Sequence, residues 1–517
     1  MWSPSVFLAG ATTITLILLF FWNSKRSSDK TSRLPPGPRG LPVLGYLPFL
    51  GPDLHKEFAK LYQRYGAIFK VRLGSKLCVV ISSPSLVKEI VRNQDVTFAN
   101  RDVSITAKVM THGGNDIAFS DYGPEWKNRR KIFVREMMSN GSLHASYELR
   151  RRSVRKAIQE VSGKIEEPVD VGELVFRTNM SNIMNMVWGA MLDGEHGKKV
   201  GTQFKKLVAE MMVLIGKPNI SDFFPMLAKF DLQGLEKRSK ELIVVFEKIL
   251  DEAIERSYQA LIESRKDVKG EGNGSKDFLT LLLELKDRED SATPISMTQI
   301  KAMLIDIVTG GSDTTSTIIE WTMAELLRHP EAMERVGKEL EQVVGLDNEV
   351  EQSHLPKLNY LEAVVKEASR LHPAVPFLVP RRLTKTTTVG GYTIPKNSAI
   401  FLNVYSIHRN PAFWENPLDF RPERFLSSGE ETNKMDFSGN NFEYLPFGSG
   451  RRVCPGLPLA ERMLIYQLAS LLHSFEWKLP AGSKVDMSDK FGLVVKKTEP
   501  LIAIPTPRLS NSDLYFK

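Results

Sequence analysis

The chain has 517 residues and only two cysteines, Cys78 and Cys454. Two thiols so far apart exclude a disulfide framework, a C-x-x-C redox pair, a cysteine-based zinc site and a C-x-x-C-H motif. The low count is typical of a protein that folds in a reducing compartment. Cys78 lies among Leu77, Val79 and Val80, and this apolar setting predicts a buried structural thiol.

A strong excess of either charge is also missing. The chain has 69 lysines and arginines against 61 aspartates and glutamates, a net charge of +8. A surplus this small does not indicate nucleic-acid binding, and its simplest interpretation is a solvated surface. Charged residues make up 25% and hydrophobic residues 42% of the chain, which excludes disordered and collagen-like classes. The length allows two or three average domains or one large enzyme domain.

Long apolar runs are absent except for one segment near the N-terminus. Residues 6–22 (VFLAGATTITLILLFFW) carry no charge, and as a helix they would extend about 25 Å, near the lower limit for a bilayer span. No lysine or arginine precedes this segment, whereas Lys25, Arg26, Lys30 and Arg33 follow it. The positive-inside rule therefore predicts a signal anchor with the rest of the chain in the cytosol. A cleaved signal peptide and a buried helix are the alternatives.

The chain is predicted to have four parts. A transmembrane signal anchor occupies residues 1–23, a basic and proline-rich hinge residues 24–45, a globular domain residues 46–508, and a tail residues 509–517. The hinge is expected to be stiff and extended, because its LPPGPRGLP stretch contains four prolines.

Helical periodicity dominates residues 124–371. Strand-like pieces occur at residues 69–82, which turn at Gly74, and again at 386–394 and 399–404. The sequence therefore predicts a mainly α fold with a minor β region, preceded by one N-terminal transmembrane helix.

Residues 447–456 (FGSGRRVCPG) carry the strongest chemical signal. Their glycines permit tight turns and a close approach of the backbone to a planar ligand. Arg451 and Arg452 place positive charge beside Cys454, and the helix expected after Gly456 adds the positive end of its dipole. These charges should lower the pKa of the thiol and favour a thiolate, with a packed free thiol as the alternative.

A second candidate segment is residues 309–315 (TGGSDTT), in the middle of a helix predicted over residues 296–328 with a capping box at its start. Two glycines inside a helix cost about 1 kcal/mol each relative to alanine, so we expect a local opening or the approach of a ligand here. Asp313 and Thr314 follow directly and are suited to relay protons. The alternative is a glycine-packed helix crossing with a solvent-facing aspartate.

Residues 447–456 resemble the haem-ligand loop of the cytochrome P450 family, F-x-x-G-x-R-x-C-x-G. The positions that match are Phe447, Gly450, Arg452, Cys454 and Gly456. The resemblance implies that Cys454 is the axial thiolate ligand of haem b iron and that Arg452 contacts a haem propionate.

Residues 310–315 likewise resemble the family pattern [A/G]-G-x-[D/E]-T-[T/S]. The resemblance implies that Thr314 hydrogen-bonds the bound oxygen. It also implies that Asp313 supplies the protons with which one oxygen atom is released as water.

Two more motifs follow the order of the family. Glu367 and Arg370 form an E-x-x-R pair on one helix face, and Arg424 lies in a P-E-R-F segment. The E-x-x-R spacing alone is weak evidence, but the resemblance implies a buried structural network of these three side chains beneath the haem.

Trp126 and Arg130 match the W-x-x-x-R pattern of the family, and Arg381 occupies another position that contacts haem propionates in it. Lys127, Arg129 and Lys131 are expected to face solvent. In the family this basic side receives NADPH–cytochrome P450 reductase, and a merely solvated charged face is the alternative.

The resemblance covers residues 34–508 and is closest to plant microsomal members. It implies the cytochrome P450 fold, with residues 46–508 as the haem-binding catalytic domain of a single-pass endoplasmic reticulum protein that faces the cytosol. One departure is Asp102, which stands where proline is usual and affects only the local path of the substrate-side loop.

The implied activity is that of a monooxygenase. It hydroxylates or otherwise oxidises a small apolar molecule with O2 and with electrons that NADPH supplies through the reductase. The pocket walls implied by the resemblance are residues 103–119, 211–224, 303–309, 375–379 and the stretch near Leu493. Their Val, Ile, Met and Phe content suits a terpenoid, a flavonoid or another phenylpropanoid. No nucleic-acid partner is expected.

Three alternatives stay open at this point. They are a haem-thiolate isomerase or dehydratase that acts on a hydroperoxide without a reductase, a non-catalytic haem-binding membrane protein, and a membrane-tethered scaffold without haem. Asp313 and Thr314 argue against the first, because such an enzyme needs no proton relay.

Overall fold

The computed structural model describes residues 33–189, 194–266, 277–288, 294–426 and 435–516, together with Thr12 and Thr15. Apart from these two threonines, the expected anchor at residues 6–22 lies outside the described residues. Across the described ranges, no helix combines the length and the apolar character needed to span a bilayer.

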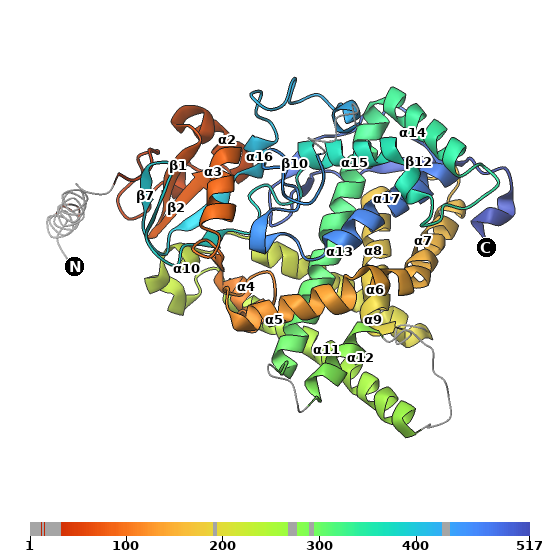
Figure 1. Cartoon of the computed structure of the whole chain (residues 1–517), viewed down its shortest axis with the longest axis horizontal. Coiled ribbons are helices and arrows are strands. Elements are labelled where there is room, and N and C mark those ends of the chain that lie inside the picture. The colour runs from red at the N-terminus through yellow and green to blue at the C-terminus, as the bar shows by residue number, and fades with distance from the viewer. Residues whose placement is uncertain are drawn as a thin grey trace, which may run out of the picture.

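Helices make up most of the described chain, as the periodicity predicted (Figure 1). The α-helices are α2 Leu54–Tyr65, α3 Pro84–Lys88, α4 Ile105–Met110, α5 Pro124–Ile132, α6 Asn140–Ala145, α7 Tyr147–Ser162, α8 Val171–Trp188, α9 Gly194–Gly216, α10 Ile220–Phe223, α11 Leu235–Lys266, α12 Phe278–Lys286, α13 Met297–Arg328, α14 Pro330–Val343, α15 Asn359–Leu371, α16 Val404–Ile407 and α17 Leu457–Ser474. Two short helical turns bear on the site, η7 Pro422–Phe425 and η9 Gly450–Arg452.

In the part of the chain that the structure describes, the strands are short and form four small sheets. They are β1 Ile68–Leu73, β2 Lys76–Ile81, β3 Asn100–Arg101, β4 Val169–Asp170, β5 Arg381–Arg382, β6 Thr387–Val389, β7 Tyr392–Ile394, β8 Ala399–Leu402, β9 Phe475–Lys478, β10 Asp489–Lys490, β11 Lys496–Lys497 and β12 Ile502–Pro507. The largest sheet has the order β1-β2-β8-β5-β3, in which only β2 and β8 run parallel. The hairpin of β1 and β2 confirms the two strands predicted around Gly74.

The two faces of this sheet bury different apolar clusters. Val79 and Ile81 belong to one cluster, whereas Val80 and Cys78 belong to the other, as the alternation of side chains along a strand requires. Burial raises the pKa of the Cys78 thiol to about 12, so it is an inert core residue, as predicted.

Helix α13 crosses the middle of the helical part, and α8 packs along it (Figure 1). A capping box of Ser296 and Gln299 starts α13, and Pro330 follows its end. The helix continues without interruption through Gly310 and Gly311, so the predicted local opening is not formed. A Cβ atom at Gly311 would lie 2.8 Å from Ile183 Cδ1 of α8, so glycine permits this close helix packing.

The proline-rich stretch is bound to the body of the protein. Lys70 N in β1 donates a hydrogen bond to Pro36 O (2.8 Å), and Thr393 N in β7 donates to Arg33 O (3.1 Å). A Cβ atom at Gly37 would lie 2.0 Å from Lys70 O. The stretch therefore lies directly against two strands rather than acting only as a spacer.

Candidate active site

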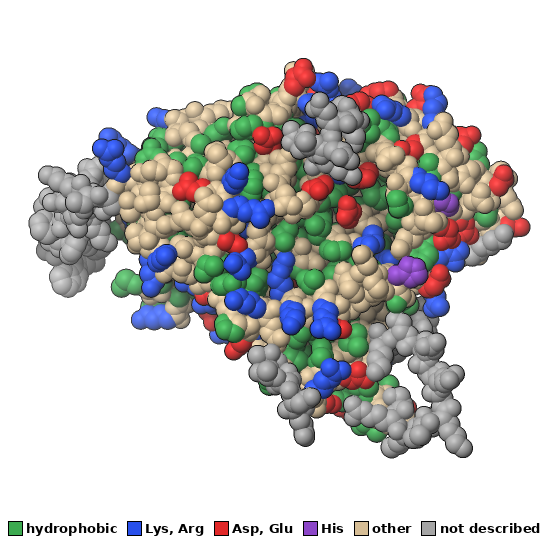
Figure 2. All heavy atoms as spheres, in the orientation of Figure 1, with side chains coloured by type: hydrophobic (Ala, Val, Ile, Leu, Met, Phe, Trp, Pro, Cys, Tyr) green, Lys and Arg blue, Asp and Glu red, His purple; other side chains and the backbone are tan. Residues whose placement is uncertain are grey.

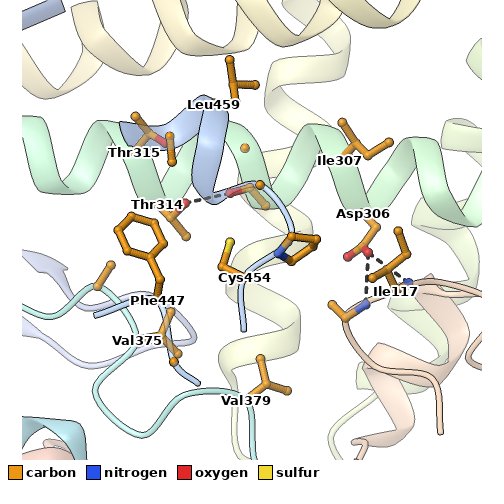
Figure 3. Close-up of a pocket in the computed structure, with 18 of the residues that line it drawn as sticks. Ile117, Asp306, Ile307, Thr314, Thr315, Val375, Val379, Phe447, Cys454 and Leu459 are labelled. Carbon is orange, nitrogen blue, oxygen red and sulfur yellow. Dashed lines mark hydrogen bonds between the residues drawn. The ribbon is translucent and has the colours of Figure 1, made fainter. Parts of the chain in front are cut away.

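A buried cavity of about 280 Å³ lies between helix α13 and the loop that carries Cys454 (Figure 3). The residues that line it are Arg101, Ile117, Ala118, Arg130, Phe133, Met138, Asn179, Asn182, Ile183, Asp306, Ile307, Gly310, Gly311, Thr314, Thr315, Ile318, Ser369, Ala374, Val375, Leu378, Val379, Arg381, Pro446, Phe447, Gly448, Arg452, Cys454, Pro455, Gly456, Leu459, Ala460, Met463 and Leu464. More than half of these residues are apolar, and ten carry polar or charged side chains, a mixture that suits a small molecule with both apolar and charged parts.

The Cys454 loop has the tight turns that its glycines predicted. Gly450 has a φ of +68°, and a Cβ atom there would lie 3.1 Å from Val91 O. Cys454 N donates a hydrogen bond to Phe447 O (3.0 Å), and this bond closes the loop. Helix α17 starts at Leu457, immediately after Gly456, as expected from the sequence. These constraints hold Cys454 at the cavity wall, where the residue as a whole is partly buried.

The electrostatic environment of Cys454 differs from the sequence prediction. Burial raises the pKa of the thiol, and the backbone N–H groups of Gly456 and Leu457 and the Arg130 charge oppose that rise. Arg451 points away, because its side chain is half exposed and pairs with Asp95 at 3.1 Å. The prediction that Arg451 and Arg452 lower this pKa is therefore wrong for the protein alone.

Thr314 lines the cavity on the side of α13 that faces the Cys454 loop (Figure 3). Its Oγ1 donates a hydrogen bond to Gly310 O at 2.7 Å. A Cβ atom at Gly310 would meet nothing within 4 Å, so this glycine leaves open space beside Thr314. The structure thus leaves room at the point where a planar ligand was expected to approach the helix.

Asp313 lies on a different face of α13 and does not line the cavity. Its side chain is buried, so the alternative of a solvent-facing aspartate is wrong. One carboxylate oxygen, Oδ1, pairs with Lys496 Nζ from β11. The other oxygen, Oδ2, is buried and has no hydrogen-bond partner among the described residues.

Four arginines meet at one end of the cavity: Arg101, Arg130, Arg381 and Arg452. Burial and the neighbouring charge of Arg381 lower the pKa of Arg452 to about 10. Burial alone has the same effect on Arg381, whose pKa is also about 10. Arg381 Nη1 is buried and has no hydrogen-bond partner among the described residues. Such a concentration of desolvated positive charge favours an anionic ligand.

Trp126 organises this cluster without lining the cavity. Its Nε1 donates a hydrogen bond to Ile117 O (3.0 Å), and the guanidinium of Arg452 lies 4.3 Å from the ring centroid. Arg130 lies 5.6 Å from the same ring and donates to Val453 O at 2.7 Å, next to Cys454. Of the predicted cofactor residues, Gly450 is the other one that does not line the cavity.

Arg101 was missed by the sequence prediction. The antiparallel pair of β3 and β5 places it directly opposite Arg381. Burial and the charges of Arg452 and Arg381 hold the pKa of Arg101 well below its usual value. Each of these strands has only two residues, too few for any periodic signal, so the pairing could not be read from the sequence.

Asp306 is the other missed residue, although it lies within the predicted wall of residues 303–309. Its Oδ2 accepts hydrogen bonds from Ile117 N and Ala118 N, both at 3.1 Å (Figure 3). Burial, and then the charge of Asp116, raise its pKa. An acid two helical turns before Thr314 was the signal that could have revealed it.

The predicted charge network is assembled beneath the cavity. Arg370 Nε and Nη2 donate to Glu367 at 2.7 and 2.8 Å, and both side chains are fully buried. Arg424 Nε in η7 lies 3.3 Å from the same carboxylate. Arg370 also donates to the carbonyls of His408 and Pro417, both at 2.7 Å. Ser369, which precedes Arg370, lines the cavity, so the network supports its wall.

The other predicted walls divide into two groups. Residues 103–119, 303–309 and 375–379 each contribute lining residues. Among the described residues, neither 211–224 nor Leu493 lines this cavity. Asp102, which replaces the usual proline, donates its backbone N–H to Pro380 O (3.2 Å), a bond that proline could not form.

Comparison with known proteins adds independent evidence. A family model described as Cytochrome P450 matches residues 35–504. A geraniol 8-hydroxylase from Swertia mussotii is 39% identical over 485 residues, which cover 93% of this chain and 95% of that protein. A flavonoid 3',5'-hydroxylase from Solanum melongena is 37% identical over 517 residues, which cover 98% of each chain.

The solved structures agree with this picture. A zebra fish cytochrome P450 determined with progesterone superposes with a TM-score of 0.74 at 27% identity. The match covers 89% of this chain and all of that one (100%).

Proposed function

The chain belongs to the cytochrome P450 family, and from this premise we propose that it hydroxylates a small apolar plant metabolite at the cavity beside Cys454. Enzymes of this family are haem-thiolate monooxygenases, so the activity class and the haem cofactor follow from membership. Four further points are our proposals. They are the residues that hold the cofactor, the identity of the substrate, the redox partner and the membrane anchor.

The cavity fits a planar, dianionic group such as haem. Four arginines concentrate positive charge at one end of the cavity. Arg381 Nη1 lies 3.7 Å from Asp95 Oδ1 but makes no hydrogen bond among the described residues, so it can still donate one to a ligand. At the opposite wall, Gly310 leaves the space that a side chain would otherwise fill. Cys454 lines the same cavity and would supply a soft sulfur ligand for iron.

We assign the haem contacts residue by residue. Cys454 holds the iron, and the N–H groups of Gly456 and Leu457 stabilise the charge on its sulfur. Arg130, Arg381 and Arg452 serve the propionates together with Arg101, and Trp126 orients two of these guanidinium groups through its ring. Phe447 packs at the cavity wall, while Gly450 allows the turn before Cys454.

When bound, haem supplies the redox chemistry that activates O2, and the chain controls the protons. Thr314 donates its only hydroxyl proton to Gly310 O, so its oxygen can accept a hydrogen bond from a protonated group in the cavity. Asp313, one residue before it, is the acid that replaces each consumed proton.

We propose that electrons arrive at the basic side of the molecule. Lys127 and Lys131 on α5 are exposed, and they flank Arg130, which lines the cavity. The expected exposure of Arg129 is wrong, because this side chain is buried and its Nε donates to Asp116 O at 3.2 Å. Figure 2 shows Lys and Arg side chains gathered over α5 on this face. An acidic flavoprotein such as NADPH–cytochrome P450 reductase suits this surface, since complementary charge speeds association. The endoplasmic reticulum membrane, with residues 6–22 as anchor, remains our proposed location.

The substrate class is proposed from the cavity and the relatives. Ile117, Ile307, Val375 and Val379 line the cavity with apolar side chains (Figure 3). The named activities of the relatives concern a monoterpenol and flavonoids, both small and largely apolar. A terpenoid or a flavonoid is therefore the proposed substrate.

One observation carries the proposal: Cys454 and Thr314 line the same buried cavity as four arginines. Geraniol and a flavonoid should be tested with purified enzyme, reductase, NADPH and isotopically labelled O2. The expected product gains one labelled oxygen atom and requires both reductase and NADPH. Product formed from a hydroperoxide without reductase would favour the isomerase alternative instead.

A further inference from the structure

His55 lies in the first turn of α2, and its side chain is fully buried. Its Nε2 donates a hydrogen bond to Asp489 Oδ2 (3.1 Å), at the start of the hairpin formed by β10 and β11, residues 489–497. We propose that His55 is a positioning residue, which holds this hairpin against residues 374–379 of the cavity wall and so determines how tightly the cavity binds an apolar ligand. The inference rests on the function proposed above, because this wall matters only if a small molecule binds beside it.

The His55 ring makes a polar and an apolar contact with the same hairpin. Besides the bond to Asp489, it stacks on the Phe491 ring, with the centroids 5.5 Å apart and an angle of 16° between the planes. Asp489 and Phe491 are two residues apart, the spacing at which side chains of a strand share a face. The Tyr405 ring of α16 meets the His55 ring at 84°, with the centroids 4.8 Å apart. One buried side chain therefore contacts both the hairpin and α16.

The charge of Asp489 is stabilised by two side chains of α2. Lys56 Nζ also pairs with this carboxylate. Burial favours the neutral carboxyl group, but the bonds from His55 and Lys56 outweigh burial and hold the pKa of Asp489 at about 2. Lys56 is 40% exposed, so water competes with its bond, whereas His55 donates from the protein interior. Asp489 keeps Lys56 when the His55 bond is removed, and a His55 variant should therefore still fold.

The hairpin reaches the cavity wall through Phe377. The rings of Phe491 and Phe377 lie 5.9 Å apart, and Phe377 is buried. In the sequence Phe377 stands between Val375 and Val379, which both line the cavity (Figure 3). The hairpin is described in full, and none of its residues lines the cavity itself. Its influence on a bound ligand must therefore pass through residues 374–379.

Two backbone hydrogen bonds attach the same wall segment to its supports. Tyr405 N donates to Pro376 O (3.1 Å), and Val495 N donates to Ala374 O (2.9 Å). The first bond comes from the residue whose ring packs against His55, and the second comes from the hairpin. The amide protons of these two donors therefore report whether the wall segment stays in place.

His329 offers a matched control, because it makes the same kinds of contact at another place. Its Nδ1 lies 3.5 Å from Glu325 Oε2, and its ring stacks on the Phe420 ring with the centroids 5.0 Å apart. Glu325 also pairs with His372 at 2.7 Å, just as Asp489 has a second partner. None of these four residues lines the cavity. His329→Phe thus removes a similar bond without removing the support of residues 374–379.

The binding test uses the haem-loaded protein with two probes, imidazole and 4-phenylimidazole. Imidazole is small and reports the iron, whereas the phenyl group of the second probe also meets the apolar walls. His55→Phe keeps an aromatic ring but cannot donate to Asp489, so the wall loses a hydrogen bond to a charged group and must be ordered by the ligand. The Kd of 4-phenylimidazole should rise roughly tenfold, and that of imidazole should not change.

Two further variants make this test specific. His55→Gln, whose amide N–H can reach Asp489, should recover most of the affinity for 4-phenylimidazole, and His329→Phe should match the wild type. Unchanged binding of 4-phenylimidazole in His55→Phe, or an equal loss for both probes, would overturn the proposal. A failure of His55→Gln to recover affinity would assign the effect to ring packing and overturn the role of the hydrogen bond.

A second readout needs no ligand. Hydrogen–deuterium exchange, measured by mass spectrometry of peptides, follows the amides of Tyr405 and Val495. His55→Phe should accelerate exchange at both roughly tenfold, because local opening of the wall segment costs less free energy. Peptides from α7 should exchange as in the wild type. Unchanged exchange at Tyr405 and Val495, or the same acceleration in His329→Phe, would contradict the proposal.

The two readouts separate this inference from the function on which it rests. A haem-loaded enzyme that binds both probes normally in His55→Phe refutes only the role of His55. A protein without thiolate-bound haem refutes the proposed function, and the exchange experiment still decides whether His55 holds the wall segment.

Discussion

At the scale of single residues, the two cysteines show how surroundings decide the use of a thiol. Burial in the sheet core raises the pKa of Cys78, and no backbone donor opposes it. Burial also raises the pKa of Cys454, but two N–H groups and Arg130 act against the rise. Cys454 in addition lines a cavity. We infer that iron, which displaces the thiol proton, completes the stabilisation of its thiolate.

Thr314→Ala removes the hydroxyl that faces the cavity. The variant should bind haem normally, because Thr314 belongs to the proton relay and does not hold the cofactor. It should divert much of the reducing power from product to hydrogen peroxide, since the relay loses its inner oxygen. The measurement is peroxide formed per NADPH consumed, and Thr314→Ser, which keeps a hydroxyl, is the control. Equal coupling in Thr314→Ala and the wild type would refute the assigned role.

At the scale of elements, α15 and η7 are joined by a buried network of charged side chains. Glu367 accepts bonds from Arg370 and Arg424, and it also accepts the backbone N–H of Arg421 at 2.8 Å. A buried carboxylate with this many donors is fully satisfied, so the loss of one partner leaves uncompensated charge.

Arg370→Ala should destabilise the protein by about 3–5 kcal/mol and give little or no haem-loaded protein. The haem content of purified protein and its melting temperature report the effect. Arg335→Ala is the matched control, because Arg335 makes a half-exposed pair with Glu423 of the same η7 turn. It should cost less than about 1 kcal/mol. Near-normal haem content in Arg370→Ala would contradict the network.

Helix α13 and the segment at residues 117–118 are connected through Asp306, and this connection should depend on pH. Burial, followed by the charge of Asp116, raises the pKa of Asp306 to about 8. A raised carboxyl pKa means that the folded state holds the proton more tightly. The tighter proton binding contributes its full stability below pH about 4, the ordinary pKa of the carboxyl group. This stability is lost as the pH rises through the pKa of the folded state.

Asp306→Asn should therefore lose less stability than the wild type between about pH 5 and pH 9, since an amide keeps a hydrogen-bond acceptor and cannot ionise. Melting temperatures of both proteins across this range report the difference. If the melting temperatures of both proteins change with pH in parallel, Asp306 does not bind a proton more tightly in the folded state.

Elements with long-range periodicity were readable from the sequence, and brief ones were not. Helix α13 followed from its capping box, its apolar spacing and Pro330, and the β1–β2 hairpin followed from Gly74. The Cys454 loop was found through its resemblance to the family rather than through physical reasoning alone. The Arg101–Arg381 pairing depends on two-residue strands that tertiary contacts create, so no local pattern predicts it.

At the scale of the whole molecule, the small net charge hides an uneven distribution. Lys127 and Lys131 lie exposed on α5, on either side of Arg130 in the sequence, which lines the cavity. The composition showed only a net charge of +8 and could not show where the charges gather. A partner attracted to this face would approach the cavity closely, which electron transfer requires.

The double substitution Lys127→Ala and Lys131→Ala should weaken the functional interaction with the reductase. The apparent KM for reductase should rise several-fold at low salt, and the difference should shrink at high salt because exposed charges are screened. Lys338→Ala on α14 is the control, since this lysine is also exposed and lies on another part of the molecule (Figure 1). An unchanged salt dependence in the double variant would place the docking surface elsewhere.

The central claim is that Cys454 binds haem iron as a thiolate. The most direct measurement is the carbon monoxide difference spectrum of the reduced protein, recorded for the wild type, Cys454→Ser and Cys78→Ser. The account predicts the red-shifted Soret band of a thiolate-bound haem in the wild type and in Cys78→Ser, and its loss in Cys454→Ser. A wild-type protein without this band, or a Cys454→Ser variant that keeps it, would contradict the account.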